Sequence, residues 1–322
     1  MRVQNYKKKM KCARIICIYA KFFVPLQPIM AKIGVFDSGY GGLTILEAIR
    51  KEIPEYDYLY LGDNARAPYG THSFDVIYRY TLQAVNYLIE QDCALIILAC
   101  NTASAKALRT IQQRDLPVIN GNGLRVTGYG GKVNVLGVIR PTVEAVPEMT
   151  KTGHVGILAT PATVSSESYV LELEKIAKSQ ELRAKSLVVT QQACPMWVPL
   201  IEAGEHTQEG ADYFVEKYIR EILAKDPQID TLVLGCTHYP LLIEKIEKSL
   251  KSKVESQKIQ IIAQGELEAK SLADYLTRHP EYREQLSTNG TCHYLTTENA
   301  DRFAQSASHF LGSPISANHI DL

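Results

Sequence analysis

The sequence lacks an excess of charge of either sign. Its 322 residues include 35 lysine and arginine residues and 35 aspartate and glutamate residues, so the formal net charge at pH 7 is +0. A balanced chain has no general attraction for nucleic acid or for an anionic membrane surface. Its length suggests about two domains with substantial cores. We therefore expect a small-molecule partner, without nucleic acid or membrane binding.

The cysteines lack the pattern of a disulfide framework or of a metal site. Their number, seven, is odd, and their spacing is neither dense nor regular, which is typical of a reducing compartment. No two of them form the local C-x2-C pair of structural zinc sites. We therefore predict a cytoplasmic protein without a metal site.

The N-terminal segment lacks a complete targeting signal. A basic run over residues 7–11 precedes an apolar run over residues 15–19, as in a signal peptide, but Lys21 interrupts the pattern and no small-x-small cleavage site follows. The apolar run is far shorter than the roughly 20 residues that span a bilayer. We interpret residues 1–30 as an extension that is either disordered or a mis-called start, because Met30 opens the first expected core strand.

The sequence also lacks a nucleotide-binding motif. An apolar strand over residues 33–36 leads into the glycine-rich turn DSGYGG at residues 37–42 and then into an amphipathic helix. The glycines do not match G-x-G-x-x-G or the P-loop, and no Lys-Ser or Lys-Thr pair follows them. Nucleotide binding is therefore disfavoured, and Asp37 and Ser38 stand at the end of a strand.

Two apolar runs end in a cysteine. The run LVLG at residues 232–235 stops at Cys236, and the run LIILA at residues 95–99 stops at Cys100. In both cases small polar residues and then a helix follow, which indicates two strands that are buried on both faces. Ligands of open α/β sheets bind at the carboxyl ends of the strands. The two thiols therefore stand where a ligand is expected.

The two halves of the chain share this plan. Residues 33–38 resemble residues 155–163, where a strand ends in a Thr-Pro-Ala-Thr turn, and the Cys100 strand resembles the Cys236 strand. Five glycines within residues 121–131 indicate a loop between domains. We therefore predict two similar α/β domains that face each other.

Paired thiols at matching strand ends suggest acid/base chemistry. A thiol hydrolase needs one cysteine with a base and leaves the second cysteine unexplained, and the zinc spacing is missing. Proton transfer on opposite faces of one carbon centre uses both cysteines, and it is a racemisation. A thiol with a pKa of about 8.5 is only a few per cent ionised at neutral pH. Each cysteine therefore needs a nearby group that stabilises its thiolate or accepts its proton. The candidates are Asp37 for Cys100, and His238 with Glu202 for Cys236.

Four motifs together resemble the glutamate racemases of the aspartate/glutamate racemase superfamily. They are DSGYGGLT at residues 37–44, PYG at 68–70, ACNTA at 99–103 and GCTHYP at 235–240. The resemblance implies an enzyme that interconverts L- and D-glutamate without a cofactor and supplies D-glutamate for peptidoglycan synthesis. The alternatives are an aspartate racemase of the same superfamily, or a regulatory or binding protein of racemase ancestry.

The resemblance also implies an architecture. Two pseudo-symmetric α/β domains with mainly parallel sheets enclose the active site in the cleft between them. The first domain is expected to comprise residues 31–125 and about 265–322, and the second domain about 126–264. We also expect a homodimer.

Carried over position by position, the resemblance implies a set of site residues. Cys100 and Cys236 correspond to the two catalytic acid/bases. Short hydroxyl and amide side chains, with backbone N–H groups, can bind two carboxylates without a buried unpaired cation. The expected substrate contacts are Asp37, Ser38, Tyr69, Gly70, Asn101, Thr102, Thr163, Thr237 and His238.

Three departures from the family pattern affect substrate affinity and domain motion rather than the chemistry. His72 stands where the family has Lys or Arg, and residues 121–131 resemble an insertion. Gln264 and Gly265 replace an expected Asp-Ser-like pair.

Overall fold

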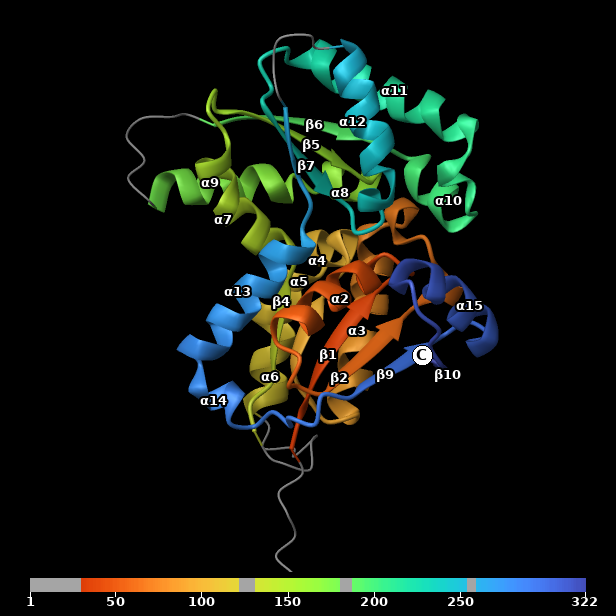
Figure 1. Ribbon diagram of the computed structural model, residues 1–322. Helices are drawn as coiled ribbons and strands as arrows, with labels where there is room; N and C mark the ends of the chain where they lie inside the picture. The colour runs from red at the N-terminus through yellow and green to blue at the C-terminus, as the bar shows by residue number, and fades with distance from the viewer. Residues whose placement is uncertain (1–29, 122–130, 180–186, 254–258) are drawn as a thin grey trace, which may run out of the picture.

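The computed structural model describes residues 30–121, 131–179, 187–253 and 259–322 (Figure 1). The predicted extension before Met30 and nearly all of the predicted insertion at 121–131 lie outside these residues. Among the described helices, none is both long and apolar enough to cross a membrane.

The larger sheet contains six parallel strands in the order β10-β9-β2-β1-β3-β4. Strand β1 is central, and its burial on both faces explains why its sequence is a continuous apolar run. The strands are β1 (Lys32–Asp37), β2 (Tyr58–Gly62), β3 (Cys93–Leu98), β4 (Asn134–Gly137), β9 (Cys292–Thr296) and β10 (Asn318–His319).

Helices cover both faces of this sheet. One face carries α2 (Gly42–Glu52), α13 (Gly265–Arg278), α14 (Pro280–Arg283) and α15 (Ala300–Leu311). The other face carries α3 (Phe74–Glu90), α4 (Asn101–Lys106), α5 (Leu108–Thr110), a π-helical turn (Ile111–Asp115) and α6 (Leu116–Gly121). Two 3-10 turns, Asn64–Arg66 and Tyr69–Thr71, follow β2.

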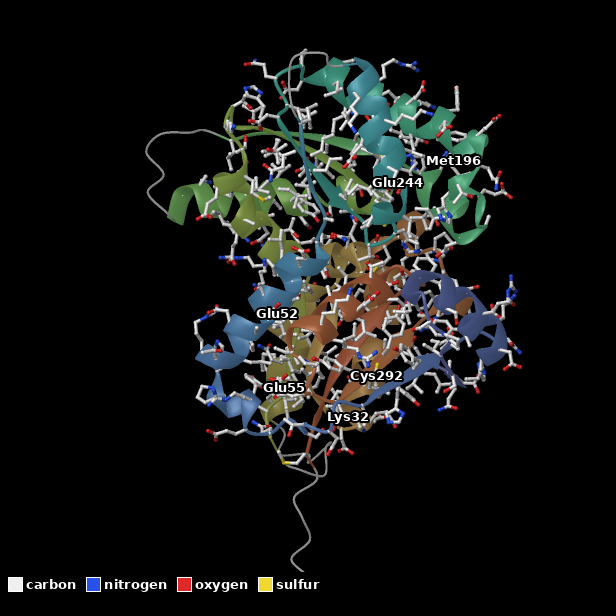
Figure 2. All side chains as sticks on the ribbon, viewed as in Figure 1. Lys32, Glu52, Glu55, Met196, Glu244 and Cys292 are labelled. Atoms are coloured by element: carbon white, nitrogen blue, oxygen red, sulfur yellow. The ribbon has the colours of Figure 1, made fainter. Side chains whose placement is uncertain are left out.

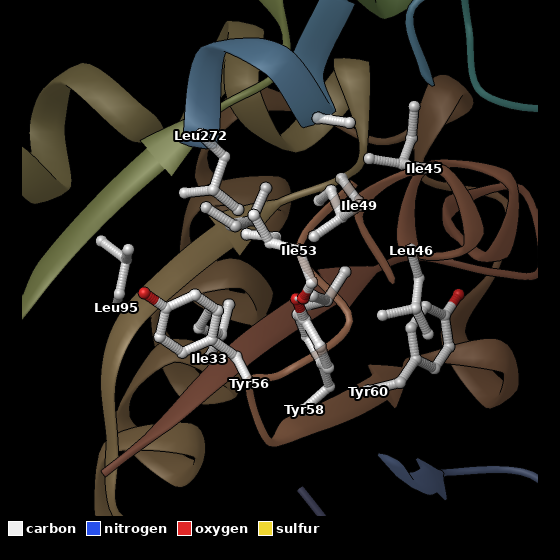
Figure 3. Packing of buried hydrophobic residues seen from close by; sticks show 14 of the residues in the cluster. Ile33, Ile45, Leu46, Ile49, Ile53, Tyr56, Tyr58, Tyr60, Leu95 and Leu272 are labelled. Carbon is white, nitrogen blue, oxygen red and sulfur yellow. Dashed lines mark hydrogen bonds between the residues drawn. The ribbon is translucent and has the colours of Figure 1, made fainter. Parts of the chain in front are cut away.

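Alternation along each strand divides the core into two layers. Ile33 points toward α2 and α13, whereas Phe36 points toward α3. Figure 3 shows the first layer, in which Leu46 and Ile49 of α2 lie over the sheet beside Leu272 of α13. Because α13 follows the segment that forms the second domain, the C-terminal part of the chain completes the first domain.

The smaller sheet contains four parallel strands in the order β6-β5-β7-β8. These strands are β5 (His154–Ala159), β6 (Val188–Ala193), β7 (Thr231–Gly235) and β8 (Gln260–Ile262). Its helices are α7 (Ile139–Met149) and α9 (Ser168–Ser179) on one face, with α10 (Trp197–Glu202), α11 (Glu209–Lys225) and α12 (Ile243–Lys253) on the other. The short elements are α8 (Pro161–Ser165) and the 3-10 turns Glu205–Thr207 and Tyr239–Leu242.

The two sheets share one topology. The order β2-β1-β3-β4 in the first domain corresponds to β6-β5-β7-β8 in the second. In each domain the chain first moves to one side of a central strand and then crosses to the other side. The prediction of two similar α/β domains with parallel sheets is confirmed.

Two details differ from the sequence-based expectations. The expected division at residue 125 falls before β4, but β4 pairs with β3 in the larger sheet. Strand β10, which the sequence analysis does not predict, pairs beyond β9 and forms the edge of the larger sheet. Both β4 and β10 are short, so their sequences carry little periodicity.

The carboxyl ends of the central strands point toward the domain boundary. Lys32, at the start of β1, lies at the end of the first domain that is remote from the second (Figure 2). Asp37, at the other end of β1, therefore faces the second domain. Strand β7 has the matching orientation, so that Cys236 faces the first domain across a shared cavity.

Candidate active site

The cavity lies where the strand order reverses in each sheet. In the first domain this point is between β1 and β3, and in the second it is between β5 and β7. Ligands of open α/β sheets bind at such switch points. The cavity is small, about 50 Å³, and it is lined by both domains, which suits a small molecule.

Most predicted site residues line this one cavity. The structure brings together the following residues from the prediction: Asp37, Ser38, Tyr69, Gly70, Cys100, Asn101, Thr102, Glu202, Cys236, Thr237 and His238. Thr163 is fully buried behind the wall, and Thr160 lines the cavity instead.

Cys100 stands between β3 and α4. Its Sγ accepts a hydrogen bond from the Ala103 N–H at 3.4 Å and lies 3.3 Å from Ser38 Oγ. Burial, followed by the negative charge of Asp37, raises the pKa of the Cys100 thiol to about 12. Cys100 is therefore a neutral thiol in the resting site.

Asp37 is a buried carboxyl at the end of β1. Its Oδ2 accepts a hydrogen bond from the Gly39 N–H at 3.0 Å. Burial raises the pKa of Asp37, and the charge of His238 opposes that shift. Within the described part of the chain, Asp37 Oδ1 has no hydrogen-bond partner. This oxygen is available to a cationic or N–H group of a ligand.

Cys236 has an imidazole beside it. His238 Nδ1 lies 3.8 Å from the Cys236 Sγ, and His238 Nε2 lies 3.1 Å from Oε1 of Glu202, the last residue of α10. Burial alone would lower the pKa of His238, but its contacts with Cys236 and Glu202 raise that pKa well above its usual value. The predicted pairing of His238 with Glu202 is therefore present as a direct contact.

An aromatic side chain from the first domain covers this imidazole. Phe310 of α15 meets the His238 ring edge-on, with the ring centroids 6.2 Å apart. Phe310 also stacks on Tyr40 at 5.7 Å, and Tyr40 belongs to the turn after β1. Helix α15 of the first domain thereby contacts the His238 side of the cavity.

Hydroxyl groups form the opposite wall. Thr102 Oγ1 lies 3.0 Å from Thr160 Oγ1, so the hydrogen bond joins the two domains. Thr160 caps α8 and accepts from the Thr163 N–H at 3.3 Å. A Thr-Pro pair at a strand end is a signal for such a cap, because Thr suits the N-cap and Pro the first helical position. That signal favours Thr160 over Thr163 as the residue that lines the cavity.

Two glycines allow the domains to approach. A Cβ atom on Gly41 would lie 2.4 Å from Thr237 Oγ1 and 2.5 Å from His238 Nδ1. A Cβ atom on Gly70 would lie 3.0 Å from the Cβ of Thr160. Glycine is needed at these positions because residues of the second domain approach closely.

The loop that carries Tyr69 is held in place by other residues of the first domain. The Tyr69 hydroxyl donates to Asp63 Oδ2, which also accepts from Arg66 Nε at 2.7 Å. His72, the departure noted above, lies with its Nε2 3.2 Å from the Arg66 carbonyl oxygen. The Tyr69 hydroxyl is therefore engaged inside the domain.

A third thiol also lines the cavity. Cys194 follows β6, and its Sγ donates to the Gln192 carbonyl oxygen at 3.6 Å. Burial raises the pKa of Cys194 well above its usual value. This cysteine is a neutral wall residue.

Among the described residues, no group of three or more His, Cys, Asp or Glu side chains is arranged to hold a metal ion.

Comparison with known proteins agrees with this architecture. The fold and cavity define a two-domain α/β protein with a small-molecule site between the domains. The model of the Asp/Glu/hydantoin racemase family matches residues 43–270, and the chain belongs to that family.

Named relatives and solved structures include glutamate racemases. The glutamate racemase of Ruegeria sp. is 39% identical over 289 residues, which cover 87% of this chain and 96% of the relative. A glutamate racemase structure from Bacillus anthracis matches with a TM-score of 0.76 and 30% identity, covering 91% of this chain and 98% of that chain. The Francisella tularensis glutamate racemase in complex with D-glutamate matches with a TM-score of 0.73 and 30% identity, covering 90% of this chain and 97% of that one.

Proposed function

We propose that this protein interconverts L- and D-glutamate by two-thiol proton transfer at the α-carbon, and that it supplies D-glutamate for peptidoglycan synthesis. The observation that carries the proposal is the position of Cys100 and Cys236, which stand at equivalent strand ends of two domains and line one cavity. The glutamate racemases among its relatives support glutamate as the substrate.

The reaction uses one thiol on each face of the substrate. For L-glutamate, the Cys236 thiolate removes the α-proton, and the electron pair of the broken C–H bond is delocalised into the α-carboxylate. The Cys100 thiol then donates its proton to the opposite face and becomes the thiolate. Reversal of these roles converts D-glutamate into L-glutamate. The contact of His238 with Cys236 supports His238 as the acceptor of the thiol proton.

The polar groups of the cavity suit the three charged groups of glutamate. Asp37 Oδ1, which has no hydrogen-bond partner among the described residues, can accept a hydrogen bond from the α-ammonium group. Ser38, Thr102 and Thr237 carry hydroxyl groups that can donate to carboxylate oxygens. Because the raised pKa of Cys100 keeps it protonated, it suits the donor role in the L-to-D direction.

Chiral chromatography of the reaction products tests the proposal. The purified protein, dialysed against a chelator and without added pyridoxal phosphate, is incubated with L-glutamate and, separately, with L-aspartate. We expect D-glutamate to accumulate. Formation of D-aspartate alone would identify an aspartate racemase, and the absence of turnover on both would favour a binding or regulatory role. Activity that requires an added cofactor or metal would contradict the cofactor-free reaction.

We also propose a cytoplasmic homodimer. The described cysteines Cys93, Cys100, Cys194, Cys236 and Cys292 are all free thiols, which supports a reducing compartment. The homodimer rests on the family resemblance. Light scattering of the purified chain at several concentrations tests it, and a single monomeric mass throughout would contradict it.

A further inference from the structure

A buried hydrogen-bonded cluster extends from the cavity wall into the interior, and the reaction described above assigns it no role. It consists of Asn101, which opens α4, together with Tyr169 of α9 and Gln264, which precedes α13. All three side chains are 2% exposed or less. Both connections between the domains pass here, because Val138 follows β4 and Gln264 follows β8.

Each polar atom of the Asn101 side chain has a defined partner. The Tyr169 hydroxyl donates to Asn101 Oδ1 at 2.7 Å, and Asn101 Nδ2 donates to Gln264 Oε1 at 2.5 Å. Gln264 Nε2 lies within 3.1 Å of three acceptors: the Tyr169 hydroxyl oxygen, the Val138 carbonyl oxygen and Thr142 Oγ1. Burial raises the pKa of Tyr169, so that its hydroxyl remains a donor.

The direction of these hydrogen bonds is set by a backbone carbonyl. The Val138 oxygen can only accept, so the nitrogen of the Gln264 amide must face it. Gln264 Oε1 therefore faces Asn101, and an acceptor there requires the nitrogen of Asn101. A flipped Asn101 would place two oxygens against each other and leave buried groups unpaired, which is costly. The orientation of the Asn101 amide is thus determined by groups outside the cavity.

One N–H of Asn101 remains for the cavity. Asn101 Nδ2 carries two hydrogens, and Gln264 is its one hydrogen-bond partner within the described part of the chain. Asn101 lines the cavity between Cys100 and Thr102. A fixed N–H donor at this place complements a carboxylate oxygen of a ligand.

We infer that Tyr169 and Gln264 are positioning residues that lock the Asn101 amide with its free N–H toward a substrate carboxylate. This inference rests on the proposed function, because it takes glutamate as the ligand. It also gives Gln264, which departs from the family pattern, a defined task. The two residues act only through Asn101 and do not touch the substrate.

A double-mutant cycle tests the inference. Tyr169→Phe and Gln264→Met are each measured alone and combined with Asn101→Ala, with kcat/KM for L-glutamate as the readout. We expect Asn101→Ala to lower kcat/KM by about 100-fold and each positioning variant by about 10-fold. In the Asn101→Ala background, the same two substitutions should change kcat/KM by less than about twofold, since their effect passes through the missing amide.

Tyr58→Phe is the matched control. Tyr58 is also fully buried, and its hydroxyl donates to the Ile53 carbonyl oxygen at 2.6 Å within the core of the first domain. Its loss should lower the Tm without changing kcat/KM, which separates loss of stability from loss of positioning. If Gln264→Met does not fold, Tyr169→Phe alone completes a cycle.

Two results would overturn the inference. The first is an unchanged kcat/KM in Tyr169→Phe, and the second is a loss that adds fully to that of Asn101→Ala. A wild-type protein without turnover of L-glutamate would instead contradict the proposed function itself. The two failures are therefore distinguishable.

Discussion

The two cysteines occupy equivalent places in the two domains, but their neighbours are different. Cys100 has a serine hydroxyl at 3.3 Å and a backbone N–H at 3.4 Å, with the buried Asp37 carboxyl nearby. Cys236 has the imidazole of His238, which Glu202 contacts from its far side. The shared topology repeats the position of the thiol, while the loops after the strands decide what assists it.

Symmetry of the fold therefore does not require symmetry of the chemistry. L- and D-glutamate have equal free energies in achiral solvent, so kcat/KM must be equal for both enantiomers in any variant. The different neighbours of Cys100 and Cys236 therefore cannot make kcat/KM larger for one enantiomer than for the other. Their inequality should appear in isotope exchange, in pH dependence and in the separate values of kcat and KM.

Removing either thiol should have the largest effect. Cys100→Ala and Cys236→Ala should each lower racemisation by about 10³-fold or more, because one face of the substrate then lacks its acid/base. Circular dichroism of the glutamate pool measures the rate. Near-normal racemisation by either variant would contradict the two-thiol reaction.

Turnover in heavy water distinguishes the two thiols in the wild-type protein. D-glutamate formed from L-glutamate should carry deuterium at the α-carbon, and L-glutamate recovered early should carry little, because the returning proton comes from a different thiol. Mass spectrometry of the separated enantiomers measures both. Rapid entry of deuterium into unconverted L-glutamate would show that a single group removes and returns the proton.

Forcing the two domains apart at the cavity should have the next largest effect. In Gly41→Ala, the new Cβ would overlap Thr237 Oγ1 and His238 Nδ1, so that the second domain must shift. A displacement of about 1 Å can cost about 100-fold in rate, and we expect kcat/KM to fall by that order. Gly210→Ala is the control, because a Cβ there meets nothing within 4 Å. Equal activities of the two variants would show that the close approach is not needed.

Glu202→Gln tests the carboxylate that contacts His238 beside Cys236 and leaves the neighbours of Cys100 unchanged. The carboxylate contributes to the raised pKa of His238, so the variant should have a lower His238 pKa and a kcat about 10-fold lower. The limb of the kcat profile that reports His238 should move to lower pH. A fully active variant with an unchanged profile would make Glu202 structural.

Glu268→Gln changes a buried carboxyl that does not line the cavity. Its effect on activity should be the smallest, and its main effect should be on the pH dependence of stability. Burial raises the pKa of Glu268 in α13 from 4.5 to about 7. Between these values the unfolded chain has lost a proton that the folded chain keeps, so folding stability falls as pH rises through this window. The loss amounts to about 3 kcal/mol. Urea unfolding should show Glu268→Gln to be more stable than wild type at pH 8 but not at pH 4.

The exposed Glu266 on the same helix provides the control for this prediction. Glu266→Gln should produce no stability gain that grows between pH 4.5 and 7. A similar gain in both variants would mean that the general charge of the helix, rather than the buried carboxyl, is responsible.

The parts of the site that were predictable from the sequence are those at strand ends. A buried run that stops at Cys100 or Cys236 identifies the edge of a parallel sheet, since apolar length and the following helix suffice to place it. Glu202 and His238 were expected to assist Cys236, but only the structure shows that they touch across a separation of 36 positions.

Other features depend on packing that periodicity does not record. Tyr169, Gln264 and Phe310 come from helices or connections whose sequences resemble ordinary core or surface segments, and only the meeting of distant elements gives them neighbours in the site. The short strands β4 and β10 are decided by pairing with β3 and β9. Their few residues contain too little pattern to fix a sheet position.

The pairing of β2 with β9 has a consequence for synthesis on the ribosome. Tyr58 pairs with Cys292 in this ladder, so one edge of β2 stays unpaired while more than two hundred further residues are translated. The second domain is complete in sequence before that edge is covered, and an uncovered strand edge invites pairing with other chains. Phe310 emerges later still. A nascent chain that stops before α15 therefore holds both thiols yet lacks the aromatic cover of His238.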